Sequence, residues 1–469
     1  MTVITRTRTQ ATPDVNGGRP NEDLLGTERI GRLLARMSIP AMLAMIVNAL
    51  YNVVDTIFVG RGVGSIAIGA LTVAFPFQIF TMAIAFLLGT GAASVVSRAL
   101  GAGDRVRAAG TATTAVLSAV ILGVVLSIVG FVFTTPILRL FGASDDVMPF
   151  ASLYIRTILF GTPFLVVAMT SNNLIRAEGN ARMSMLVMLV GAVANIILDP
   201  IFIFGFGMGI RGAATATVIG QVLSFAVAAA YFLGGRSGLM SGVKTPSPSL
   251  RLLRPVVILG LPAFIRQFGS TFVAVLVINA ALAYGGDLAI ASFGMINRVL
   301  IFALMPVFGL AQGFQPIAGY NYGAGRMDRV KQSTRLTALV AAAITGFFFI
   351  LMVLIPETLL SMFTTDGALL EIAGPAMRTV VFVLPLVGVQ VVGATFFLAV
   401  GKAIPSLVLG MLRQIILLIP LVAILPPLLG LRGLWLAFPI ADALAAVITF
   451  AWLGLFMGRH LTMKPLMEQ

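Results

Sequence analysis

Two aspartates interrupt long apolar stretches of this sequence, and polar residues accompany each of them at helical spacing. Asp55 stands in NALYNVVDTIFVG (residues 48–60), on the helix face that would carry Asn48 and Tyr51. Asp199 stands in VANIILDPIFIFGFG (residues 193–207), four positions after Asn195. A charged side chain inside a membrane helix costs about 2.5–3.5 kcal/mol and commonly marks an ion or proton pathway. The two acids therefore predict the loading and release of a small cation.

More polar residues lie nearby in the same half of the chain. Asn172 and Asn173 belong to the run TSNN, while Thr217 and Gln221 are four positions apart in a later apolar stretch. We expect these groups and the acids to form a polar cavity, with Asn48, Asn173 and Gln221 as the candidates for substrate contact. Simpler roles stay open. Asp55 could reach the outer interface or be satisfied by its polar neighbours, and Asp199 could form part of an Asp-Pro helix break.

The elements that position these residues must be membrane helices. Hydrophobic residues make up 59% of the 469 positions and charged residues only 10%, against roughly 25% charged in soluble domains. Apolar windows long enough to cross a bilayer favour helices, which pair their own backbone groups. We predict twelve spans, at residues 38–59, 66–90, 109–133, 150–174, 183–204, 210–233, 255–284, 288–312, 336–360, 375–399, 406–428 and 434–457.

The positive charge of the chain indicates topology. Most Lys and Arg residues fall in the two tails and in alternate loops, such as those at residues 98–107, 176–182, 236–254 and 326–335. This is the distribution that the positive-inside rule gives when both termini are cytoplasmic. The net charge of +14 therefore does not predict a nucleic-acid partner, and we expect a protein of the plasma membrane, the inner membrane in a bacterium.

The chain also repeats itself at an offset of 222 residues. Pro40 corresponds to Pro262, and GAGD at 101 corresponds to GAGR at 323. Six spans separate the copies, so we predict two parallel six-helix lobes related by a pseudo-twofold axis, a design in which transporters bind substrate between the lobes. The predicted boundaries are a disordered cytoplasmic tail at 1–27, lobes at 28–234 and 255–458, a cytoplasmic linker at 235–254 and a second tail at 459–469.

The repeat serves as an internal control for the acids. Asp55 corresponds to Val277, and Asp199 corresponds to apolar residues near Leu421. The same fold does without either carboxylate in the second half, so we infer that the acids serve function rather than architecture. In the second half we expect Arg298 and Asp442 to form a structural ion pair, and Arg413 to extend toward the cytoplasmic interface.

The motifs LYNVVDTIFVG, NIILDPIFIFGFG and GFQPIAGYNYGAGRMDRV resemble those of the MATE family, the multidrug and toxic compound extrusion transporters, from about residue 30 onward. The acids in the first lobe resemble the DinF-type branch. This resemblance implies a cation-coupling set of Tyr51, Asp55, Asn172, Asn195, Asp199 and Thr217. The NorM-type branch has further acids in the second lobe, where this sequence offers Gln267 and Gln390. The resemblance leaves proton and sodium open as the coupling ion.

We therefore predict a monomeric antiporter that exports organic, cationic and lipophilic compounds in exchange for protons, with sodium as the alternative ion held by Asp55 and Asp199. No cofactor, resident metal or nucleic acid is expected, and the partners are small-molecule substrates and membrane lipids. A lipid-linked saccharide flippase and a passive channel are the alternatives. A membrane enzyme is disfavoured, because the chain has no Cys and its one His is His460 in the tail.

Overall fold

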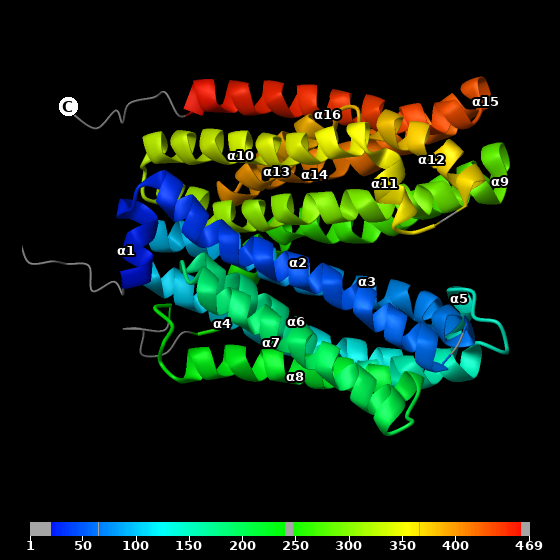
Figure 1. Cartoon of the computed structure of the whole chain (residues 1–469). Coiled ribbons are helices and arrows are strands. Elements are labelled where there is room, and N and C mark those ends of the chain that lie inside the picture. The colour runs from blue at the N-terminus through cyan, green and yellow to red at the C-terminus, as the bar shows by residue number, and fades with distance from the viewer. Residues whose placement is uncertain (1–19, 64, 240–246, 365, 461–469) are drawn as a thin grey trace, which may run out of the picture.

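The computed structural model describes residues 20–63, 65–239, 247–364 and 366–460. Every regular element in these ranges is helical, and the helices form two lobes that lie side by side (Figure 1). The N-terminal lobe contains α2 (Ile30–Val63), α3 (Ser65–Gly101), α4 (Arg105–Val132), α5 (Thr134–Leu140), α6 (Met148–Ala177), α7 (Ala181–Pro200), the π-helical turn η1 (Ile201–Gly205) and α8 (Ile210–Leu233).

The C-terminal lobe begins with one very long helical element. Its members are α9 (Leu250–Gly323), α10 (Met327–Leu354), α11 (Pro356–Ser361), α12 (Gly367–Val380), α13 (Leu384–Ala399), α14 (Ala403–Met411), η2 (Leu412–Leu418), α15 (Ile419–Leu429) and α16 (Leu431–His460). At 1.5 Å per residue, the 74 residues of α9 are far longer than a bilayer is thick. The helix breaks at Gly286, whose φ of 64° is left-handed, so α9 provides two spans.

Counting α9 as two spans, and α12 with α13 as one span bent by 50°, gives the twelve predicted spans in the described chain. The repeat is also visible in the loops. Gly103 and Gly325 have φ values of 76° and 71°, and each follows the second span of its half. Each lobe buries its own apolar core, for instance around Leu159 in the first and Val277 in the second. The structure therefore confirms the predicted fold class.

The lobes meet where α3 crosses α9, and the contact there is between backbones. A Cβ atom on Gly260 of α9 would lie 1.7 Å from the carbonyl oxygen of Leu87, and one on Gly323 would lie 2.1 Å from that of Arg98. Gln315 of α9 adds a hydrogen bond to the carbonyl of Thr90 at 3.2 Å. Glycine thus permits a separation between helices that any side chain would prevent.

Three of the predicted boundaries differ from the structure. Residues 20–27 were assigned to a disordered tail, but Pro20–Thr27 form helix α1, and Leu25 in it is fully buried. Residues 250–254 were assigned to the linker, but they form the first turns of α9. The second tail was predicted to begin at residue 459, but residues 459–460 belong to α16. Residues 1–19 and 461–469 of the two predicted tails and residues 240–246 of the linker lie outside the described residues.

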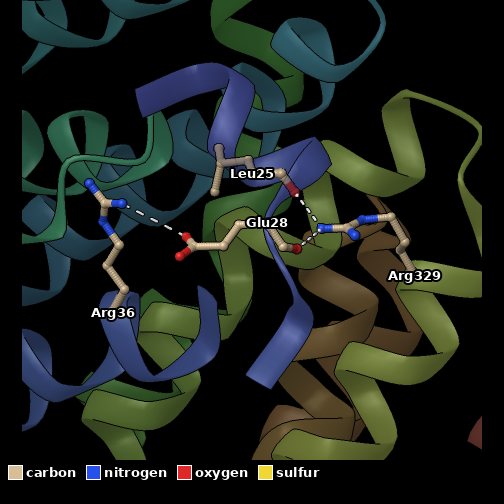
Figure 2. Close-up of polar contacts among 4 residues, drawn as sticks. All are labelled: Leu25, Glu28, Arg36 and Arg329. Carbon is tan, nitrogen blue, oxygen red and sulfur yellow. Dashed lines mark hydrogen bonds and ion pairs between the residues drawn. The ribbon is translucent and has the colours of Figure 1, made fainter. Parts of the chain in front are cut away.

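Helix α1 lies at the end of the molecule where α16 also ends (Figure 1), and it joins the two lobes. Arg329 of α10 donates to the carbonyls of Glu28 at 2.7 Å and Leu25 at 3.4 Å, while Glu28 forms an ion pair with Arg36 of α2 at 3.8 Å (Figure 2). The last carbonyls of a helix have no partners within it, and a guanidinium is well suited to satisfy them. These bonds hold α1 against the C-terminal lobe.

The backbone contact leads to a first prediction. Gly260→Val should lower the free energy of unfolding by about 1–3 kcal/mol, because the new side chain would push α9 away from α3. Gly294→Val is the matched control, since Gly294 lies in the same helix with open space around it. Thermal unfolding in detergent measures both variants, and equal losses would show that the tight crossing is unimportant.

A second prediction concerns α1. Arg329→Ala should cost about 1 kcal/mol of local stability and speed hydrogen exchange at the amides around Leu25 and Glu28, because their carbonyls lose a charged donor. Arg335→Ala, at an exposed position two turns away in the same helix, should leave that exchange unchanged. Equal exchange in the two variants would contradict this role for Arg329.

Candidate functional site

The carboxyl groups of Asp55 and Asp199 lie within hydrogen-bonding distance of each other, although 144 positions separate them in the chain. They meet because α2 and α7 pack side by side (Figure 1). Asp199 is fully buried, and one oxygen of Asp55 is buried without a hydrogen-bond partner. Two carboxyl groups can share such a contact only when a proton or another cation lies between their oxygens.

Asn195 and Thr217 continue the site on the side of Asp199. One orientation of the Asn195 amide satisfies both of its ends: the nitrogen donates to Asp199 Oδ2 at 2.7 Å, and the oxygen accepts from the Thr217 hydroxyl at 3.1 Å. The Tyr51 hydroxyl is hydrogen-bonded to the Thr217 side chain. Five of the predicted residues, from α2, α7 and α8, therefore form one network.

Two members of this cluster were missed by the sequence analysis. Tyr154 of α6 is buried near Asp55, Tyr51 and Asp199, and its hydroxyl accepts a hydrogen bond from Gln78 of α3 at 2.9 Å. Gln78 is a polar residue in the apolar run FPFQIF, the same signal that identified Asp55. Tyr154 gives no such signal, because tyrosine is common in membrane helices near their ends.

Asn172 and Asn173 lie in a different cluster. The Asn172 side chain donates to the Ser184 carbonyl at 2.6 Å, and Arg176 donates to the Asn173 side chain at 2.6 Å. Ser184 precedes Asp199 by fifteen residues of α7, which is about 22 Å along the helix. The structure thus separates Asn172 from the five residues with which the family resemblance grouped it.

The remaining candidates lie between these clusters. Gln221 follows Thr217 by one turn of α8, and its side-chain oxygen is buried without a hydrogen-bond partner. Asn48 is half-buried on α2, seven residues and about 10 Å before Asp55. Along the helix axes, both residues therefore lie between the level of the acid pair and that of the Asn172 cluster.

The second lobe has a different arrangement at the corresponding places. Val277, the counterpart of Asp55, is fully buried in an apolar core. Asp442 is also buried, but its partner is Arg413 rather than the predicted Arg298. The prediction failed because η2 directs Arg413 inward toward α16, whereas Arg298 is exposed on α9. Among the described residues, no cluster of three or more metal-binding side chains is present.

Comparison with known proteins identifies the family. The MatE family model matches the chain twice, at residues 40–201 and 262–424, and the two matches begin 222 positions apart. The chain belongs to the MatE family. The predicted family resemblance and the predicted internal offset are thereby confirmed.

Individual MatE relatives are similar over nearly the whole chain. The multidrug export protein MepA of Staphylococcus aureus (strain MRSA252) is 27% identical over 416 residues, covering 89% of this chain and 92% of MepA. An outward-facing structure of a multidrug resistance MATE transporter gives a TM-score of 0.89 at 27% identity, covering 94% of this chain and 99% of that one. A transporter structure from Pyrococcus furiosus gives a TM-score of 0.90 at 26% sequence identity, covering 96% of this chain and 100% of that one. It is described as having a binding pocket of reverse polarity that suggests a different function.

The protein is thus an integral membrane protein and a multidrug efflux transporter of this family, not an enzyme. Its homologues bind small molecules, and transporters of the family need no cofactor.

The network around Asp199 generates a prediction. Asn195→Leu should lower the free energy of unfolding by about 1–3 kcal/mol, because it leaves a buried carboxyl oxygen without its donor. The double variant Asn195→Leu/Asp199→Leu should recover most of that loss, because donor and acceptor are then both removed. The measurement is thermal unfolding of both variants and of a control variant, Asn297→Leu, at an exposed position of α9. Additive losses in the double variant would contradict the bond.

Proposed function

We propose that this MatE transporter is an antiporter that exports organic, cationic and lipophilic compounds, and that Asp55 and Asp199 carry the coupling ion. The observation that supports the proposal is the contact between two carboxyl groups in the first lobe, where the second lobe has the buried Val277 in place of Asp55. Like charges at this distance repel each other strongly in a medium of low polarity. A bound proton removes the repulsion, so the pair gains and loses an ion as its surroundings change.

The direction of transport follows from where the lobes touch. Both ends of the described chain lie at the end of the molecule where α1, the glycine contact and most of the loop arginines are found. We place this end in the cytoplasm, because cytoplasmic loops carry the excess of Lys and Arg. Asp55 lies 25 residues after the start of α2, about 38 Å along that helix, and therefore in the outer half.

The mechanism couples the ion to the access of the two sides. In this structure the lobes are closed against each other at the cytoplasmic end, so the outside exchanges the ion. A proton entering from outside joins Asp55 to Asp199, repacks Asn195, Thr217 and Tyr51, and lowers the affinity of the cavity for a cationic substrate. Loss of that proton to the cytoplasm restores the negative charge that attracts the next substrate. Sodium is the alternative ion, because the same side chains offer it carboxyl, amide and hydroxyl oxygens.

Reconstituted liposomes test the coupling. The purified protein should accumulate a fluorescent organic cation against its concentration gradient when a proton gradient is imposed. Asp55→Asn and Asp199→Asn should each reduce that accumulation to the level of empty liposomes, because a neutral amide cannot gain and lose the ion. Asp145→Asn, at a fully exposed loop carboxylate, is the matched control and should transport like the wild type.

The other outcomes separate the remaining functions. Accumulation driven only by a sodium gradient would retain the antiporter and replace the ion. Movement that never exceeds equilibrium would indicate a passive channel, and no movement of any cation would favour a lipid-linked saccharide flippase. Normal uphill transport by both acid variants would refute the role of the pair. A single transporting copy per liposome, measured by dilution, tests the further expectation that the protein acts as a monomer.

A further inference from the structure

A hollow of about 320 Å³ lies between the first turn of α7 and the last turns of α8, at the end of the molecule that we place in the cytoplasm. Its walls are Asn180, Arg182, Met183, Leu186, Tyr231 and Arg236. The acid pair lies near the opposite end of α7, so this hollow is separate from the coupling site.

The inner side of the hollow is a hydrogen-bonded network built around Glu178. This carboxylate is almost fully buried and accepts hydrogen bonds from the Tyr231 hydroxyl, from Ser237 Oγ at 2.9 Å and from the Leu239 amide at 3.2 Å. Asn180 in turn donates to the Tyr231 hydroxyl at 3.2 Å. The network holds the chain on both sides of Arg236. Its three donors stabilise the negative charge of Glu178 inside the protein.

Two guanidinium groups remain at the rim. Arg182 and Arg236 are exposed, and neither guanidinium group forms an ion pair or hydrogen bond with any residue that the structure describes. Arg182 lies at the start of α7 and Arg236 follows the end of α8, so the two line the same hollow from different helices. The nearby carboxylate of Glu178 is already occupied by its three hydrogen-bond donors. Two unpaired guanidinium groups around one hollow suit a phosphate group, which accepts several hydrogen bonds from such donors.

The hollow opens onto an apolar face of α7. Leu186 lies in the hollow and is 46% exposed, and Val193 and Ile197 follow it with 45% and 55% of their surfaces exposed. Steps of seven and four residues place all three on one side of the helix. In a membrane protein such a face is in contact with acyl chains. The ligand that matches both parts therefore has a phosphate head and a long apolar tail.

We propose that this hollow binds one anionic phospholipid, with its headgroup phosphate between Arg182 and Arg236 and its acyl chains along the exposed face of α7. Basic pockets between membrane helices at the cytoplasmic surface are suited to such headgroups. The bound lipid would fix the start of the helix that carries Asn195 and Asp199, and so would link membrane composition to the coupling site. Binding itself does not depend on the proposed antiport.

Lipid-dependent thermal stability tests the site. Phosphatidylglycerol added to the protein in a neutral detergent should raise the unfolding midpoint, and phosphatidylcholine with the same acyl chains should raise it less. Arg182→Gln/Arg236→Gln should weaken the apparent affinity for phosphatidylglycerol about thirtyfold, since each basic residue contributes roughly 1 kcal/mol of attraction to anionic lipid. The matched control is Arg211→Gln/Arg432→Gln, which removes two exposed arginines at the opposite end of the molecule.

Two results would overturn the proposal. Equal loss of affinity in the two double variants would mean that general charge attraction, not this hollow, holds the lipid. Stabilisation of the wild type by millimolar inorganic phosphate, to the same extent as by phosphatidylglycerol, would mean that the site takes free phosphate and that the apolar face is irrelevant. Transport in liposomes is measured separately, so a failed antiport assay leaves the binding result interpretable.

Discussion

Most of this chain has no water available to its backbone, and that constraint determines which structures it can form. Each helix must pair its own amides and carbonyls, so irregular backbone in the described helices is confined to a few places, such as the turn at Gly286 between two spans, η1 and η2. One of these places directly follows the site. Pro200 provides no amide donor, and η1 begins immediately after it, so the regular part of α7 ends beside Asp199. The acid is therefore held by a rigid helix next to a segment with different geometry.

The two lobes share one fold and differ in how they balance charge. In the second lobe Arg413 and Asp442 neutralise each other, so this pair is complete without any ligand. In the first lobe Asp55 and Asp199 contact each other, and two ionised carboxylates at that distance would repel. The repeat thus gives two copies of one scaffold, and the second neutralises its buried Asp442 with an arginine of its own.

Much of this arrangement can be predicted from the sequence because the signals are local. Apolar windows define the spans, the recurring GAG motifs at 101 and 323 define the repeat, and the spacing of Asn195 and Asp199 places them on one helix face. The contacts between distant helices have no such signal. Tyr154 joins the acid pair and Asn172 does not, because 18 residues of α6, about 27 Å, separate them along the helix axis, and the packing of α6 against its neighbours decides which of them is level with the acids.

The predicted disordered tail was wrong at helix α1 because the contacts that hold this helix are also between distant parts of the chain. Its sequence, PNEDLLGT, has the composition of a flexible tail, and an isolated helix of eight residues is not stable. The partners that hold it, Arg329 and Asn321, lie about 300 residues away and are not visible to any local pattern. Its fold is therefore a property of the assembled lobes.

The glycine contact between α3 and α9 has a consequence for the speed of conformational change. Interlocked side chains must change rotamers or deform when two helices separate, and that produces a kinetic barrier. At Gly260 and Gly323 the facing surfaces are bare backbone whose shape is nearly smooth. No side chain has to leave a matching hole at these two points, although Val256 and Leu259 of α9 belong to the same buried core as Leu88 of α3. At these two glycines the barrier to separating α3 from α9 therefore depends on backbone contacts rather than on side-chain rotamers.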